Sequence, residues 1–257
     1  MKFNPINRRR FFRALFYGVP TLAVADALWV EPEWIKIRRV RLTQEKPAHR
    51  FVHFTDLHHK GDHAYLASAV KQINALSPEF VCFTGDIIED ANYLTDALEL
   101  LRDIKSPLYG APGNHDYWSG ADFGVIATAF AATGGKWLVD ESVLTADSKV
   151  NIAGATCLKP PQLSLNPGSK NVVLIHYPEW VEKLTNYKFD IALAGHSHGG
   201  QFRIPFYGPL VVPFGVGRYD LGLFRTASGP LYVGAGLGWF YLNVRFNCRP
   251  EITMIEI

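Results

Sequence analysis

The stretch Gly113-Asn114-His115-Asp116 decides how this chain of 257 residues is interpreted. It places an amide, an imidazole and a carboxylate on three consecutive side chains directly after a glycine. This grouping suits a metal-bound phosphate better than a surface turn. The apolar run at residues 108–111 predicts a buried strand just before it. The three polar side chains are therefore expected to follow the carboxyl end of that strand.

Four other segments carry the same kind of chemistry. They are Asp56-Leu57-His58, Gly85-Asp86, Ile175-His176 and Gly195-His196-Ser197-His198. Each follows a short apolar run that reads as a buried strand, at residues 51–54, 80–83, 172–175 and 191–194. Open α/β sheets place their sites at the carboxyl ends of their strands, so we expect these side chains to meet.

The segments between these strands indicate a layered α/β fold. Apolar residues at helical spacing predict three helices, at residues 66–76, 94–104 and 122–132. Alternating apolar and basic residues predict an edge strand at residues 34–42. From Lys136 the pattern changes to short strands, which indicates that a second sheet begins there. The further strand candidates are residues 137–139, 143–145, 150–153, 201–204, 231–234 and 252–257.

Taken in chain order, the five polar segments resemble the signature of the calcineurin-like metallophosphoesterase family. The resemblance runs from about Phe51 to the C-terminus. Arg218-Tyr219 and Asn247-Cys248-Arg249-Pro250 bring the chain closest to bacterial membrane-associated phosphodiesterases with a twin-arginine signal. The family also includes UDP-2,3-diacylglucosamine pyrophosphatases. The resemblance implies a four-layer α-β-β-α sandwich, in which two packed mixed β-sheets are flanked by helices.

The resemblance also implies the roles of the site residues. Asp86 would bridge two divalent metal ions, and one of these ions would also be bound by Asp56, His58 and His198. Asn114, His176 and His196 would complete the second ion. His115 would protonate the leaving oxygen, and Asp116 would orient its imidazole. Two ions about 3.5 to 4 Å apart supply a nucleophilic oxygen and stabilise phosphoryl charge. Nitrogen and oxygen ligands without a thiolate suit Mn²⁺, Fe or Zn²⁺.

The N-terminal segment, residues 1–30, is expected to be a signal or membrane anchor, and residues 31–257 the catalytic domain. Asn7-Arg8-Arg9-Arg10-Phe11-Phe12-Arg13 before a short apolar run resembles a twin-arginine export signal. Residues 23–25 fit a cleavage site. The alternative is an uncleaved amphipathic anchor. Export predicts a periplasmic or extracytoplasmic enzyme, whereas the anchor predicts the cytoplasmic face of the inner membrane.

Composition narrows the choice of partners. The net charge of +2, without a basic block beyond the N-terminus, argues against nucleic acid as a partner. Three widely spaced cysteines predict buried thiols, not disulfides. We expect a monomer that associates with membranes. A non-catalytic scaffold and a nucleotide or nucleic-acid phosphodiesterase are the alternative functions; the presence of His115 argues against a scaffold.

The expected substrate is a phosphodiester or a lipid-linked pyrophosphate. The membrane-directing N-terminus and the aromatic residues after His198, which include Trp239, Phe240 and Tyr241, favour a lipid. UDP-2,3-diacylglucosamine is the specific candidate that the resemblance offers. This lipid lies on the cytoplasmic face of the membrane, where an exported enzyme would not meet it. The specific candidate and the export prediction therefore conflict.

Overall fold

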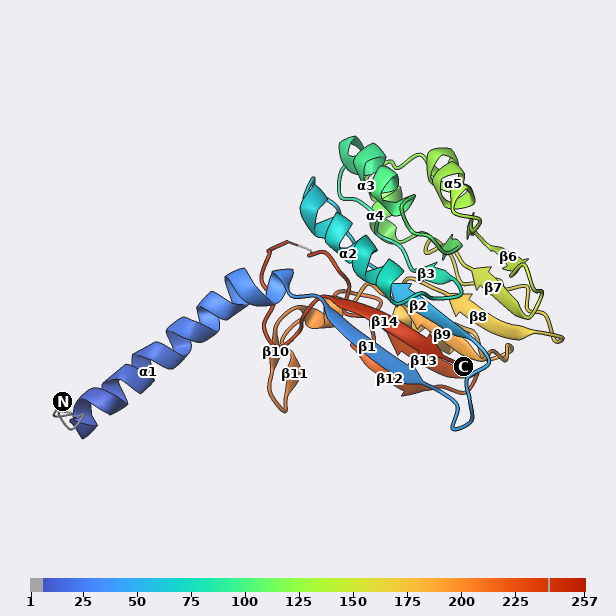
Figure 1. The fold of residues 1–257 in the computed structure, drawn as a ribbon. Coiled ribbons are helices and arrows are strands. Elements are labelled where there is room, and N and C mark those ends of the chain that lie inside the picture. Colours follow the sequence, from blue (N-terminus) through green and yellow to red (C-terminus); the bar gives the residue numbers. More distant parts are fainter. Residues whose placement is uncertain (1–6, 240) are drawn as a thin grey trace.

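The computed structural model describes residues 7–239 and 241–257. Its centre is a pair of packed mixed β-sheets with six strands each, and Figure 1 shows both. The first sheet has the order β1-β14-β2-β3-β4-β5. Its strands are β1 (Lys36–Arg41), β14 (Glu251–Glu256), β2 (Arg50–Phe54), β3 (Val81–Phe83), β4 (Leu108–Gly110) and β5 (Lys136–Trp137). Strands β2 to β5 are parallel, so their carboxyl ends lie at one edge.

The second sheet has the order β12-β13-β9-β8-β7-β6. Its strands are β12 (Gly222–Arg225), β13 (Pro230–Val233), β9 (Ile191–Ala194), β8 (Lys170–Leu174), β7 (Val150–Gly154) and β6 (Glu141–Leu144). The four central strands β13, β9, β8 and β7 are parallel, and the two outer strands are antiparallel to their neighbours. A separate hairpin, β10 (Arg203–Ile204) and β11 (Gly208–Pro209), follows β9.

Helices cover the outer face of the first sheet. They are α2 (His63–Ala75), α3 (Leu94–Leu101) and α5 (Phe123–Ala132), with the short α4 (Asn114–Trp118) and the 3-10 turn η3 (Ala91–Tyr93). The second sheet is covered by the 3-10 helix η4 (Pro178–Lys183) and loops. Separate apolar clusters lie under the helices, between the sheets and under η4. The predicted sandwich of two packed mixed sheets flanked by helices is confirmed.

The side chains of strand β2 pack into two of these apolar clusters. Side chains alternate across a strand, so Val52 and Phe54 pack under the helices while Phe51 packs between the sheets. His53 also lies between the sheets, where its Nε2 is 2.9 Å from the Thr84 hydroxyl. Burial lowers the pKa of His53 to about 3, so this imidazole is neutral at pH 7.

Two sequence predictions about the sheets need correction. The second sheet was expected to begin at Lys136, but β5 pairs with β4 and closes the first sheet. The second sheet begins with β6 at Glu141. The strand β12 was not predicted, because it has only four residues and no apolar run; Leu223 and Arg225 lie on its exposed face. The predicted edge strand is confirmed, since β1 pairs only with β14 among the described strands.

The N-terminal helix α1 (Arg8–Ala25) projects away from the domain (Figure 1) and has no buried residue. It continues into η1 (Asp26–Val30) and η2 (Glu31–Glu33). The segment Arg8–Glu33 is long and apolar enough to cross a membrane, as a signal sequence near an N-terminus also is. Its last residues contact the domain: Arg245 N–H donates to Ala27 O, and the Glu31 carboxylate accepts from two backbone N–H groups. The boundary at residue 30 stays a prediction.

A buried arginine fixes the loop after β13. The side chain of Arg245 is among the largest that are fully buried, and its guanidinium donates to four backbone carbonyls. The acceptors are the oxygens of Ala235, Gly236, Gly238 and Cys248, at 2.5 to 3.1 Å. The same loop lies against Asp56, because Gly238 N–H donates to Asp56 O at 2.7 Å. Arg245 therefore supports the position of a candidate metal ligand.

Replacing Arg245 with methionine should lower the free energy of unfolding by about 3 kcal/mol or more. The variant keeps the length of the side chain but leaves several buried carbonyls without a donor. Thermal unfolding followed by circular dichroism measures the loss. Arg102→Met at the exposed end of α3 is the control and should change stability by no more than about 0.5 kcal/mol. Equal melting temperatures for the two variants would contradict this role.

Candidate metal centre

Five strand ends deliver the polar side chains that the sequence singled out. From the first sheet, β2 is followed by Asp56 and His58, β3 by Asp86, and β4 by Asn114 at the start of α4. From the second sheet, β8 is followed by His176, and β9 by His196 and His198. All seven side chains are buried. The structure therefore brings every predicted metal ligand to one place, where the two sheets meet.

The first group consists of Asp56, His58 and His198, whose ligand atoms lie within 4.8 Å of one another. The Nε2 atoms of His58 and His198 are 2.9 Å apart. Asp56 Oδ1 is 4.0 Å from the first of these nitrogens and 3.7 Å from the second. Both carboxylate oxygens of Asp56 also accept the His196 backbone N–H at 3.0 Å, which links the two sheets.

The second group consists of Asp86, His176 and His196, with Asn114 beside it. His176 Nε2 lies 2.9 Å from Asn114 Oδ1, 3.1 Å from His196 Nδ1 and 3.2 Å from Asp86 Oδ2. The same Asp86 oxygen is 3.4 Å from His58 Nε2 in the first group. Asp86 therefore lies between the two groups, and the pair of groups fits a dinuclear site.

The hydrogen bonds around the two groups fix which histidine nitrogens face inward. His176 Nδ1–H donates to Thr84 O, and His196 Nε2–H donates to Phe214 O, each at 2.7 Å. His58 Nδ1 is held by the Glu89 carboxylate. In a neutral imidazole the other nitrogen then carries a lone pair. These lone pairs converge with carboxylate and amide oxygens, an arrangement of acceptors that a cation stabilises.

Two further features support this fit. Asn114 Nδ2 is buried and has no hydrogen-bond partner among the described residues, while its Oδ1 faces the second group. The site also attracts positive charge. Burial alone would lower the pKa of His176, but the nearby Asp86 carboxylate raises this pKa to about 9. By contrast, burial and the charge of His176 lower the pKa of His196 to about 3.

The backbone at the site is unusual. Five of the seven residues have a positive φ: Asp56 (52°), His58 (42°), Asp86 (64°), His196 (64°) and His198 (49°). Residues other than glycine adopt this left-handed region uncommonly, and it persists where the surrounding structure imposes it. Each of these turns begins directly after a parallel strand. The left-handed turns let alternate residues such as Asp56 and His58 direct side chains to a common point.

Close backbone approach explains two of the glycines. A Cβ atom on Gly113 would lie 2.1 Å from Asp86 Oδ1, and one on Gly195 would lie 2.4 Å from Asp56 Oδ2. Neither glycine has a positive φ, so the space beside the carboxylates is the reason for the missing side chain. Gly113 therefore allows α4 to lie close to Asp86 within the first sheet, and Gly195 allows the loop after β9 of the second sheet to lie close to Asp56.

The surroundings of His115 differ from the prediction. Asp116 was expected to orient the His115 imidazole, but its carboxylate accepts backbone N–H groups from Gly113, Asp86 and Ile87 at 2.8 to 2.9 Å. Burial and the charge of Asp86 raise the pKa of Asp116 to about 6. Asp116 thus holds the Asp86 loop against α4.

The sequence reasoning missed Glu89, which lies 3.0 Å from His115 Nδ1 through its Oε2 and also holds His58 Nδ1. Burial alone would raise the pKa of Glu89, but its hydrogen bonds to His115 and His58 lower this pKa to about 2. The available signal was a carboxylate three residues after Asp86, in the loop that follows a predicted strand. Glu89 is therefore the residue that orients the imidazole of His115.

Part of each group lies at the floor of a cavity of about 680 Å³. The floor residues are His58, His198, Asp86, His196, Asn114 and His115. Its walls are mainly apolar and come from the hairpin region after β9, from α4, from the loop between β8 and η4, and from the loop after β13. The wall residues include Trp118, Tyr177, Phe202, Val211, Val212, Pro213, Phe214, Tyr241, Leu242 and Val244. Of the aromatic run 239–241, Phe240 lies outside the described residues. A cavity of this size can hold a small organic ligand.

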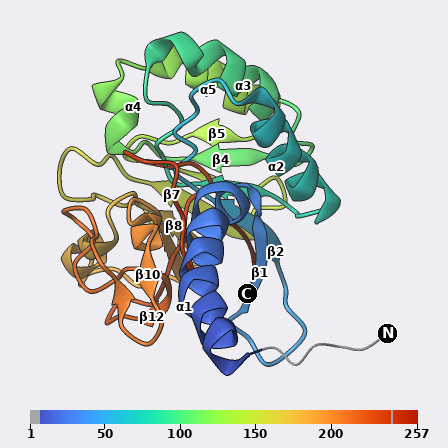
Figure 2. The ribbon, with the colours of Figure 1, turned by 90° about the vertical axis from the view of Figure 1, so that its left-hand side faces the viewer.

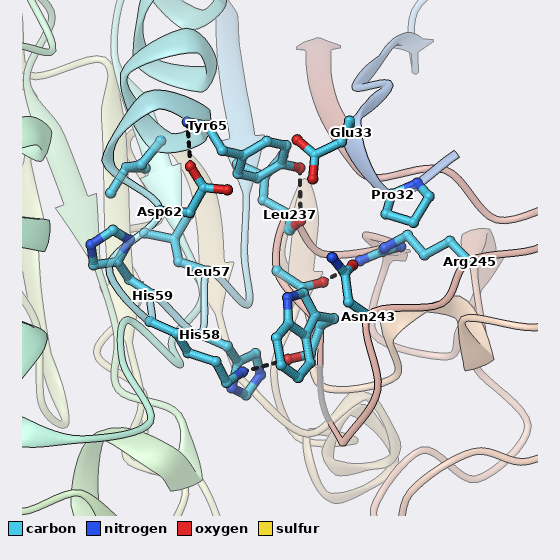
Figure 3. A pocket seen from close by; sticks show the side chains of 14 residues that line it. Pro32, Glu33, Leu57, His58, His59, Asp62, Tyr65, Leu237, Asn243 and Arg245 are labelled. Atoms are coloured by element: carbon cyan, nitrogen blue, oxygen red, sulfur yellow. Dashed lines mark hydrogen bonds between the residues drawn. The ribbon is translucent and has the colours of Figure 1, made fainter. Parts of the chain in front are cut away.

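A second cavity lies on the other side of His58 and is shown in Figure 3. Its volume of about 60 Å³ has room for a few water molecules only. Pro32 and Glu33 of η2 lie on one side of it with Arg245, and Leu57 and His59 lie on the other (Figure 3). Lys60 closes one side, with its Nζ 3.9 Å from the centre of the Trp239 ring. This cavity joins the N-terminal segment to the metal-site loops and is too small for a substrate.

Comparison with known proteins identifies the family. The sequence profile of the calcineurin-like phosphoesterases matches residues 49–200, which span the five strand ends described above. The chain belongs to this family. The calcineurin-like phosphoesterases are metal-dependent hydrolases of phosphoric esters that use two divalent metal ions. The predicted enzyme class is therefore confirmed.

Three relatives cover nearly the whole chain. The uncharacterized metallophosphoesterase YkuE of Bacillus subtilis is 29% identical over 98% of this chain and 98% of its own length. Phosphodiesterase YaeI of Escherichia coli is 27% identical over 98% and 99%. The UDP-2,3-diacylglucosamine pyrophosphatase LpxG of Chlamydia trachomatis is 25% identical over 93% and 94%. The similarity thus extends to hydrolases named for phosphodiesters and for a pyrophosphate.

Replacing Asp86 with asparagine should reduce the bound metal from two ions per chain to less than one. The change removes the one carboxylate that lies between both groups, which leaves the imidazoles without the anion they share. Elemental mass spectrometry of the purified proteins measures the stoichiometry. Asp103→Asn, at an exposed position after α3, is the control and should keep both ions. Full metal content in Asp86→Asn would reject the shared position of this carboxylate.

Proposed function

We propose that this protein is a dinuclear metal phosphoesterase that hydrolyses a phosphodiester or pyrophosphate bond in a lipid-linked substrate. One observation carries the proposal: two histidine and carboxylate groups share Asp86 at the floor of a cavity whose walls are apolar. A polar floor with apolar walls fits a substrate that combines a charged phosphate with a hydrophobic part.

The seven buried side chains are the proposed metal ligands. Asp56, His58 and His198 would hold one ion, Asn114, His176 and His196 would hold the other, and Asp86 would contribute to both. When bound, two such ions supply a nucleophilic oxygen at neutral pH and stabilise negative charge on the phosphoryl group. The set contains nitrogen and oxygen donors, and the three cysteines are buried elsewhere as free thiols. Mn²⁺, Fe and Zn²⁺ suit these donors.

His115 is the proposed general acid. It lines the cavity beside both groups, and Glu89 holds its Nδ1 at 3.0 Å. Although burial acts to lower it, the pKa of His115 is raised, because Glu89 and Asp86 favour the protonated imidazole. The acid form therefore persists to higher pH than in a free histidine. His115 gives its proton to the leaving oxygen, while Glu89 keeps the ring oriented.

The N-terminal helix supports a membrane location. Helix α1 has no buried residue, and the arginines Arg8, Arg9, Arg10 and Arg13 lie at its beginning. Positive residues favour the cytoplasmic end of a spanning helix. We propose that α1 directs the protein to the membrane with the domain on the extracytoplasmic side. An uncleaved helix lying along the cytoplasmic face is the alternative, and it would give access to UDP-2,3-diacylglucosamine.

A substrate screen with purified full-length protein and Mn²⁺ tests the proposed function. We expect turnover of bis-p-nitrophenyl phosphate, and faster turnover of lipid-linked diesters or pyrophosphates than of soluble monoesters. UDP-2,3-diacylglucosamine, named for the relative LpxG, is one of the compounds to test. Asp86→Asn is the inactive control. Preferential turnover of a soluble phosphomonoester, of DNA or of RNA would reject the lipid-linked substrate.

Replacing His115 with alanine should leave both metal ions bound and lower kcat by about 10²-fold on a substrate with an alkoxide leaving group. A nitrophenolate leaves readily without a proton, so bis-p-nitrophenyl phosphate should show a smaller loss. The ratio of the two losses, measured with metal content as a control, reports the acid role. Equal losses on both substrates would assign His115 to another task.

A further inference from the structure

The hairpin formed by β10 and β11 exposes an apolar tip. Phe206 and Tyr207 at its end have relative exposures of 110% and 77%, and Phe214 in the following loop reaches 91%. Residues 204–217 contain no Asp, Glu, Lys or Arg. Soluble proteins rarely present such an uncharged, contiguous apolar segment to water without a partner. Among the described residues, Phe206 has the largest exposed fraction of any large apolar side chain, including those of α1.

The backbone of this tip favours a role for the Phe206 side chain. Tyr207 N–H donates to Ile204 O at 3.1 Å, which closes a turn with Pro205 and Phe206 at its centre. Phe206 has φ 67°, a position in such turns that glycine or asparagine normally occupies. A bulky aromatic residue there is strained and gains no packing, because its side chain is exposed. The folded domain alone gives no reason for phenylalanine at this position.

The hairpin lies on the same side of the domain as α1. Figure 1 shows both on one side, and Figure 2, which looks at that side, shows β10 beside α1. The base of the hairpin also forms part of the metal-site cavity, through Phe202 and the apolar residues Val211 and Phe214. An apolar surface thus continues from the exposed tip to the wall above the metal ligands.

We propose that residues 204–214 dock on the lipid bilayer that α1 enters, so that the metal-site cavity opens at the membrane surface. This inference rests on the proposed function, because it explains how a lipid-linked phosphate would reach the cavity. Aromatic residues such as Phe206 and Tyr207 suit the boundary between headgroups and acyl chains. A protein partner fits less well, because the segment lacks the charged groups that give protein interfaces their register.

The depth of the hairpin in lipid can be measured directly. In the full chain, a Phe206→Cys variant is labelled with an environment-sensitive fluorophore; the three native cysteines are buried. The protein is reconstituted in vesicles of phosphatidylcholine and phosphatidylglycerol. The control is Leu144→Cys on β6, an exposed position at the far edge of the second sheet. We expect blue-shifted emission and quenching by nitroxide-labelled lipids at position 206, and neither at position 144.

The outcomes separate the possible occupants of this surface. If the fluorophore at position 206 stays as accessible to water as the one at position 144, the hairpin does not dock and the proposal fails. A blue shift that follows protein density, and is absent when the protein is diluted in excess lipid, assigns the surface to a second copy of the chain. That result also overturns the proposal. The fluorophore reports depth whether or not the enzyme turns over a lipid.

A second variant separates docking from folding. Phe206→Gly suits the positive φ, so its melting temperature should be unchanged or higher. Its turnover of bis-p-nitrophenyl phosphate should equal that of the wild type. Turnover of a lipid-linked diester in vesicles should fall about tenfold, the scale set by removing one aromatic side chain from lipid. If the variant turns over the lipid-linked diester as fast as the wild type does, the docking role is overturned. Absence of all phosphoesterase activity in the wild type would reject the proposed function instead.

Discussion

The Asp86 carboxylate is the point on which the two halves of the molecule depend. It comes from the first sheet, yet its Oδ2 lies 3.2 Å from His176 on the second sheet and 3.4 Å from His58 on its own. Burying an anion beside other acceptors is costly unless positive charge compensates it. The raised pKa of His176 has the same cause, because the buried Asp86 carboxylate stabilises a positive charge beside it. Packing of the two sheets and binding of cations are therefore coupled through one side chain.

This coupling explains why the loops at the site have such an unusual backbone. Left-handed turns at Asp56, Asp86 and His196 would be unfavourable in isolation, and each is fixed by contacts to another loop. Asp116 accepts three backbone N–H groups of the loops at Gly113 and Asp86. Arg245 holds the loop after β13, which in turn hydrogen-bonds to Asp56. Strain at the ligands is thus balanced by a surrounding set of buried polar contacts.

The sequence predicted the features that leave a pattern within a short stretch of chain. Apolar runs that end in polar residues located five of the parallel strands, and the order of the polar segments indicated which side chains would meet. Contacts between distant segments left no such pattern. The position of Glu89 after a predicted strand marks it as a candidate, but not as a contact of both His58 and His115. Asp116 follows His115 in the chain, yet its carboxylate accepts from backbone N–H groups. Likewise the pairing of the last strand, β14, between β1 and β2 depends on tertiary packing.

The cavity has a polar floor and an apolar wall, and this division limits which substrates fit it. Its floor consists of buried imidazoles and the Asp86 carboxylate, whereas its wall consists of apolar side chains such as Val211 and Phe214. A small soluble phosphate would satisfy the floor and leave the apolar wall in water. A phosphate attached to a hydrophobic group satisfies both, and it removes apolar surface from water on each side. The division of the cavity therefore favours an amphipathic phosphoric ester, which agrees with the proposed docking of the apolar hairpin on a lipid bilayer.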